Sequence, residues 1–119
     1  MAKIVIVDDE EDLLEFMESY FKSRGHEVFT AVGGREAIPL ILNQRPDVAL
    51  IDVRLKDDVD GLKVIRDVRG KAPDQKIILM TAYNDKDEEG IACGATLCIH
   101  KPTSLNEIET TVLNVINAQ

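Results

Sequence analysis

The sequence predicts an α/β fold with three layers, in which helices cover both faces of a mostly parallel sheet. Two uninterrupted apolar runs, Ile4–Val7 and Val48–Ile51, have the length and the β-branched content of strands that are buried on both faces. Five such strand patterns alternate with five helical patterns, which is typical of a parallel sheet with crossover helices. The 119 residues are enough for one such domain, and they contain no repeat or linker.

The first strand and helix follow each other closely. The strand Ile4–Val7 ends on the acidic pair Asp8-Asp9. Apolar residues then recur at the spacing of one helix face: Leu13, Phe16, Met17, Tyr20 and Phe21. Gly25 stands where a left-handed residue commonly ends a helix. We therefore expect an amphipathic helix whose apolar side chains face the core.

An edge strand and a second helix come next. Residues 26–32 alternate and are polar enough for an edge strand, which puts His26 on the surface of that strand. The second helix opens at Gly33-Gly34 and contains Pro39. Because Pro cannot donate the helical hydrogen bond, we expect a kink or a late start there.

The third strand, Val48–Ile51, runs directly into Asp52. A charge cannot lie inside a strand that is buried on both faces, so we expect Asp52 just past its carboxyl end. Open α/β sheets bind their ligands at that edge. A polar loop over residues 54–61 follows, and then a helix that ends near Gly70.

The last third of the chain contains two more strands. Residues 76–80 form a buried strand that ends on Thr81, and residues 96–99 form the last strand, which ends just before Lys101. Between them, residues 84–92 are polar with little periodicity, so a helix there would be short. A capping box opens the final helix: Ser104 and Glu107.

The composition narrows the classes of function. Lys and Arg number 14 against 22 Asp and Glu, a net charge of −8, which argues against direct nucleic-acid binding and against attachment to anionic lipid. No apolar run approaches the length of a membrane span, and the amino end shows no signal peptide. Cys93 and Cys98 fit neither a disulfide framework nor a zinc site. We expect a cytoplasmic protein whose thiols are reduced packing groups.

Four strands end on reactive side chains, at Asp8-Asp9, Asp52, Thr81 and Lys101. In a parallel sheet these ends share one edge, so the side chains converge. Carboxylates at one rim repel each other unless a cation is present, and hard oxygen ligands favour Mg²⁺. One carboxylate can then attack phosphorus while a metal and a Lys neutralise the developing charge. Each residue alone is weak evidence, but the four strand ends together are a strong signal.

At these residues the chain resembles the receiver domain of two-component response regulators, over nearly all 119 positions. The matching features are Asp8-Asp9, Asp52, Asp60-Gly61, Thr81-Ala82 and Lys101-Pro102. The resemblance implies one receiver domain over residues 1–119. It also implies a flavodoxin-like sandwich of five strands and five helices with the parallel strand order 2-1-3-4-5, which sets the first and third strands side by side.

The resemblance also implies a role for each residue. Asp52 would accept a phosphoryl group from the phosphohistidine of a sensor histidine kinase or phosphotransfer protein, and Thr81 and Lys101 would contact the phosphoryl oxygens. The implied ligands of Mg²⁺ are Asp9, Asp52 and the backbone carbonyl of Arg54, with Asp8 acting through a metal-bound water. Such a domain catalyses its own phosphorylation and slow hydrolysis and is not a metabolic enzyme. It acts through an effector domain or a partner protein. Phosphorylation-dependent dimerisation stays open.

The chain departs from the family pattern at several positions. Cys98 stands where the family often has an aromatic residue that moves with the Thr, so we expect an unusual signalling surface. The loop from Asp52 to Gly61 is about one residue longer than usual and lacks the customary Pro. Arg54 and Tyr83 lie where the family tunes the lifetime of the phosphoryl group. Their size predicts slower hydrolysis, and the alternative is that both are simply exposed loop side chains.

Two other functions compete with this one. A degenerate receiver would bind a partner without being phosphorylated, and acetyl phosphate with Mg²⁺ separates the two cases. A flavodoxin-like cofactor binder has the same architecture, but its phosphate cradle cannot be the acidic stretch Asp8–Glu11. The sequence does not identify the kinase, the stimulus or the output. It also leaves open whether the domain stands alone or belongs to a longer chain.

Overall fold

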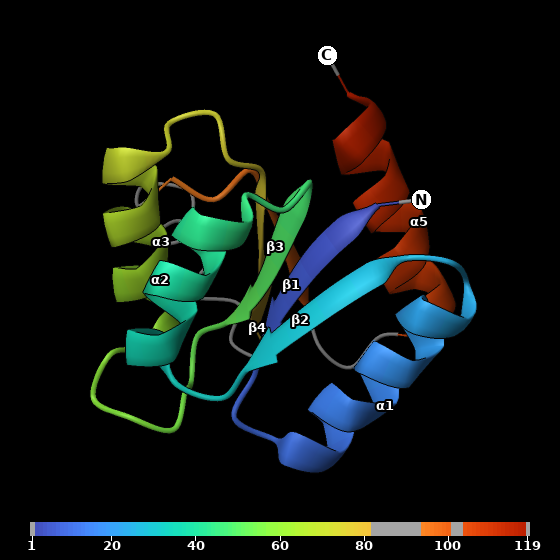
Figure 1. Cartoon of the computed structure of the whole chain (residues 1–119), viewed down its shortest axis with the longest axis horizontal. Coiled ribbons are helices and arrows are strands. Elements are labelled where there is room, and N and C mark those ends of the chain that lie inside the picture. Colours follow the sequence, from blue (N-terminus) through green and yellow to red (C-terminus); the bar gives the residue numbers. More distant parts are fainter. Residues whose placement is uncertain (1, 82–93, 101–103, 119) are drawn as a thin grey trace.

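The computed structural model describes residues 2–81, 94–100 and 104–118 and contains one sheet of five parallel strands (Figure 1). The spatial order is β2-β1-β3-β4-β5, which confirms the predicted architecture and strand order. The strands are β1 (Lys3–Val7), β2 (Glu27–Ala31), β3 (Val48–Asp52), β4 (Ile77–Thr81) and β5 (Leu97–His100). The segment 84–92, where the sequence predicts at most a short helix, lies outside the described residues.

Helices cover the sheet on both faces (Figure 1). One face carries α1 (Glu11–Ser23) and α5 (Leu105–Asn117), and the other carries α2 (Gly34–Gln44) and α3 (Gly61–Lys71). Within the described part of the chain, none of these helices is long and apolar enough to cross a membrane.

The three central strands, β1, β3 and β4, consist mainly of buried apolar residues because each side of the sheet has its own core. Along β1, Ile4 and Ile6 pack with the α1 and α5 side, whereas Val5 and Val7 pack with the α2 and α3 side. All four side chains are fully buried. Burial of each is worth about 1.5–3 kcal/mol, so both cores depend on the two-sided strands. Ser104 caps α5 as predicted, with its Oγ accepting the Glu107 N–H at 3.1 Å.

Helix α1 differs from its prediction at Phe16. The buried side chains of the helix are Leu14, Met17 and Phe21, whereas Phe16 is 64% exposed. At 100° per residue Phe16 lies about 100–160° around the helix from these three side chains, so it falls outside the stripe that meets the sheet. The predicted end of the helix is confirmed: Gly25 has φ +88°, and the turn around it contains the pair of backbone hydrogen bonds that is typical of a left-handed helix cap.

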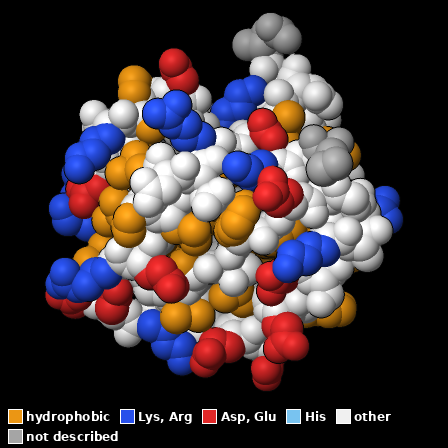
Figure 2. Space-filling model, in the orientation of Figure 1, with side chains coloured by type: hydrophobic (Ala, Val, Ile, Leu, Met, Phe, Trp, Pro, Cys, Tyr) orange, Lys and Arg blue, Asp and Glu red, His pale blue; other side chains and the backbone are white. Residues whose placement is uncertain are grey.

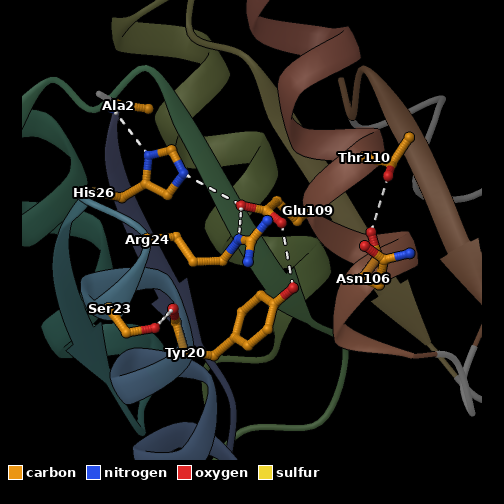
Figure 3. Close-up of polar contacts among 8 residues, drawn as sticks. All are labelled: Ala2, Tyr20, Ser23, Arg24, His26, Asn106, Glu109 and Thr110. Carbon is orange, nitrogen blue, oxygen red and sulfur yellow. Dashed lines mark hydrogen bonds and ion pairs between the residues drawn. The ribbon is translucent and has the colours of Figure 1, made fainter.

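The prediction that His26 lies on the surface of the edge strand is wrong. His26 comes just before β2, and its side chain is only 7% exposed. Its Nδ1 accepts the N–H of Ala2 at 3.1 Å, and its Nε2 lies 3.7 Å from Glu109 Oε2 (Figure 3). Because both partners are distant in sequence, local alternation gave no sign of this burial.

Glu109 joins α5 to α1 through a buried carboxylate (Figure 3). Arg24 Nε donates to Oε2 at 2.6 Å, and the Tyr20 hydroxyl donates to Oε1 at 3.2 Å. The hydrogen bond from Arg24, with smaller contributions from the charge of Arg24 and from the Tyr20 hydroxyl, holds the pKa of Glu109 below its ordinary value of 4.5. The ionised carboxylate therefore stabilises the fold.

This carboxylate predicts a pH-dependent contribution to stability. The pKa of Glu109 is lower in the folded state than in the unfolded state. The contribution of its carboxylate to the unfolding free energy is therefore present above the unfolded-state pKa, near 4.5, and is lost as pH falls through the folded-state pKa. Urea unfolding of the wild type and of Glu109→Gln over a pH series measures it. The difference in unfolding free energy should be largest near neutral pH and shrink in acid. A difference that stays constant with pH contradicts the assignment.

Candidate functional site

The carboxyl edge of the sheet brings Asp8, Asp52 and Thr81 to the ends of adjacent strands. The register pairs Val7 with Ile51, so the next residues on these neighbouring strands are Asp8 and Asp52. Adjacent strands lie about 4.8 Å apart. Asp52 pairs in turn with Met80, the residue before Thr81. Lys101 lies outside the described residues, but it follows His100, the partner of Thr81 on β5.

An acidic cluster lies where β1 leads into α1. The carboxylate oxygens of Asp8, Asp9 and Glu10 lie within 4.8 Å of one another, and over residues 2–81, 94–100 and 104–118 no other such group of three metal-binding side chains occurs. Asp8 is fully buried and its Oδ1 accepts the N–H of Glu10 at 3.0 Å. The sequence predicted Asp8 and Asp9 but missed Glu10, although it continues the acidic run. Asp52 is not in this cluster; it lies beside Asp8 on the neighbouring strand.

The donor chemistry of this edge fits Mg²⁺. Asp8, Asp9 and Glu10 offer only carboxylate oxygens, the hard donors that this ion prefers. One of them is buried and another is exposed, so an ion could contact protein oxygen on one side and keep water on the other. Figure 2 shows acidic and basic side chains interspersed over the face that carries β2 and α2.

Asp52 and Thr81 are buried at the ends of their strands. Asp52 is 9% exposed and Thr81 is fully buried, so polar side chains end two strands that are otherwise apolar. A carboxylate is costly to bury without charged or hydrogen-bonding neighbours. The sheet edge therefore holds a carboxylate and a hydroxyl on adjacent strands in a largely water-excluded position.

The Asp60-Gly61 pair packs the next helix against Asp52. Asp60 Oδ1 accepts the N–H of Lys63 at 3.0 Å and so caps α3. A Cβ at Gly61 would collide with the backbone carbonyl oxygen of Asp52. Only glycine allows α3 to begin this close to the strand end, so these two residues fix the backbone at the site.

The loop between Asp52 and α3 is hydrogen-bonded to the start of α2. Asp57 accepts hydrogen bonds from the backbone N–H groups of Gly34 and Arg35, each at 3.0 Å. These bonds, with that of Arg35 the most important, lower the pKa of Asp57. Helix α2 therefore begins at Gly34 and runs through Pro39, so of the two predicted outcomes the late start is wrong and the kink stays a prediction.

The remaining predicted residues divide into two groups. Arg54 is exposed at the site edge, and Cys98 is half-buried against the core that faces α2 and α3. Tyr83 and Cys93 lie outside the described residues. The unusual signalling surface and the slow hydrolysis stay predictions.

Comparisons with known proteins agree with this geometry. A family model described as response regulator receiver domain matches residues 4–113. Regulatory protein AtoC of Escherichia coli K12 is 34% identical over 119 residues, which cover 98% of this chain and 26% of AtoC, so the chain spans about a quarter of that relative. The structure of chemotaxis protein CheY4 from Vibrio cholerae is 30% identical, with a TM-score of 0.88, covering 97% of this chain and 98% of CheY4. The receiver domain of Francisella response regulator 1452 is 24% identical, with a TM-score of 0.89, covering 98% and 97% of the two chains.

Proposed function

Because this chain belongs to the response regulator receiver domain family, we propose that it receives a phosphoryl group on Asp52 and passes the signal to an output partner. The observation that supports the proposal is the strand register. It sets Asp52 beside the buried Asp8 of one neighbouring strand and opposite the residue that precedes Thr81 on the other. The donor is a phosphohistidine of a sensor histidine kinase or a phosphotransfer protein. We assign the whole receiver domain to residues 1–119.

The carboxylates of Asp8 and Asp9, with Asp52 and the backbone carbonyl of Arg54, would hold Mg²⁺. The support is the clustering of the carboxylate oxygens of Asp8, Asp9 and Glu10 within 4.8 Å, since a divalent cation bound there would relieve their mutual repulsion. When bound, the ion supplies positive charge that offsets the charge developing on the phosphoryl oxygens.

Asp52 acts as the nucleophile. Its carboxylate oxygen forms a bond to phosphorus as the bond from phosphorus to the imidazole nitrogen breaks, and the imidazole leaves with the electron pair and takes up a proton. The Thr81 hydroxyl donates a hydrogen bond to a phosphoryl oxygen, and Lys101 adds positive charge. Water later hydrolyses the acyl phosphate, which returns Asp52 to a carboxylate and releases phosphate.

Acetyl phosphate tests this function against the degenerate receiver. The purified protein is incubated with acetyl phosphate, with Mg²⁺ or with a chelator, and its intact mass is measured. We expect the mass to rise by one phosphoryl group only with Mg²⁺. CheY4 from Vibrio cholerae, treated in parallel, is a positive control for the reagent. If CheY4 is labelled and this chain is not, the degenerate receiver is correct.

A further inference from the structure

The loop that follows Asp52 is held at its middle by one carboxylate. Asp57 Oδ1 accepts the N–H groups of Gly34 and Val59, and Asp57 Oδ2 accepts that of Arg35, all at 3.0 Å. Helix α2 has Gly33 at its N-cap, which has no side chain to accept these bonds. Asp57, which lies 23 positions later than Gly34 in the sequence, therefore caps α2.

The two glycines make room for this contact. A Cβ at Gly33 would lie 2.8 Å from Asp57 Oδ2, and a Cβ at Gly34 would collide with the backbone carbonyl of Val59. Glycine at both positions lets the loop backbone lie directly on the first turn of α2. The contact thus depends on a carboxylate on the loop and on the absence of side chains at the start of the helix.

Other contacts hold the same loop, but they act at different places. The Lys56 N–H donates to the Val32 carbonyl at 2.9 Å. Arg35 makes a two-pronged contact with Asp58 at 2.9 and 2.7 Å, but both side chains are largely exposed, so that pair adds little. Asp57 is the residue that joins the loop to backbone groups of α2 on one side and to its own turn on the other.

We infer that Asp57 is a positioning residue for the phospho-acceptor site. The inference rests on the proposed function. The loop starts at Asp52 and ends at Gly61, which packs against the Asp52 carbonyl, and it carries the Arg54 carbonyl assigned to Mg²⁺. Both ends of the loop lie at the site, and Asp57 fixes its middle. The loop therefore holds the backbone carbonyl of Arg54 in a single orientation. Asp57 thereby couples the first turn of α2 to the affinity for Mg²⁺.

An Asp57→Asn variant separates this role from a purely structural cap. Asn keeps one acceptor oxygen, so the cap is weakened and not removed. Asp58→Asn is the matched control, because it makes the same charge change one residue away, and Asp58 contacts only the exposed side chain of Arg35 and not the backbone of α2. Lys76→Met is the control for lost stability. Lys76 Nζ binds the carbonyls of Val115, Ile116 and Ala118 at the opposite edge of the sheet.

The measurements are the Mg²⁺ dissociation constant by calorimetry, the rate of labelling by acetyl phosphate and urea unfolding. We expect Asp57→Asn to weaken Mg²⁺ binding about tenfold relative to Asp58→Asn, as for other residues that orient a ligand. Saturating Mg²⁺ should restore its labelling rate. Lys76→Met should lose stability and keep the wild-type affinity.

Two outcomes overturn the inference: equal affinities in Asp57→Asn and Asp58→Asn, or an equal loss of affinity in Lys76→Met. These outcomes differ from failure of the proposed function, in which the wild type itself neither binds Mg²⁺ nor is labelled. Hydrogen exchange adds an independent readout, because linkage requires Mg²⁺ to slow exchange at the Gly34 and Arg35 amides in the wild type and less so in Asp57→Asn.

Discussion

An Asp52→Asn variant should lose phosphoryl uptake from acetyl phosphate completely while remaining folded. The carboxamide has nearly the shape of the carboxylate but is not a nucleophile at neutral pH, so no acyl phosphate can form. Asp52 lies at the carboxyl end of β3 with 9% of its surface exposed, and its strand is otherwise apolar and buried. Intact mass after incubation with acetyl phosphate and Mg²⁺ measures the loss directly.

Asp47→Asn is the matched control, since Asp47 lies just before the opposite end of the same strand. Its Oδ2 accepts the Lys3 N–H at 2.7 Å, and an amide oxygen can keep that bond. This variant should be labelled like the wild type. Labelling of Asp52→Asn at the wild-type rate would falsify the assignment of the acceptor.

The second large effect is expected at Gly61, where alanine should destabilise the fold by about 3 kcal/mol. The new Cβ would collide with the Asp52 carbonyl oxygen, a backbone atom that cannot move without shifting β3 or α3. The shift would also displace the carboxylate of Asp52, the proposed acceptor, so labelling at a temperature where the variant is folded should be slow. Urea unfolding measures the first effect, and a time course with acetyl phosphate measures the second.

Gly70 provides the control in the same helix. A Cβ there would meet nothing within 4 Å, and Gly70 lies in the last turns of α3. Gly70 is the second-last residue of α3, so Gly70→Ala should raise the unfolding free energy by only about 0.5 kcal/mol, through backbone entropy and helix propensity. If both alanine variants change stability alike, close packing of α3 on Asp52 is not the reason for Gly61.

The sheet and its carboxyl edge were predictable because their signals are local. Strands β1 and β3 are uninterrupted apolar runs, and a strand that is buried on both faces requires such a run. Asp52 then stands out because a charge directly follows apolar residues. The sequence predicted Asp52 just past the end of its strand, whereas the structure makes it the last residue of β3, and the register of β1 with β3 places it beside Asp8.

The features that the sequence missed depend on partners from other elements. His26 is buried by Ala2 and Glu109, and α2 is capped by Asp57 from a later loop. Periodicity within one segment contains no information about such partners. Phe16 shows a related limit, because an apolar residue at helical spacing can still lie outside the buried stripe.

Locating the phosphoryl group on the wild-type protein tests the central claim most directly. The protein is labelled with acetyl phosphate and Mg²⁺ and reduced with borohydride, which converts an acyl phosphate to an alcohol, and the converted residue is identified by fragment mass spectrometry. The account predicts conversion at Asp52 alone. Conversion at Asp8 or Asp9, or at no carboxylate of this sheet edge, would contradict it.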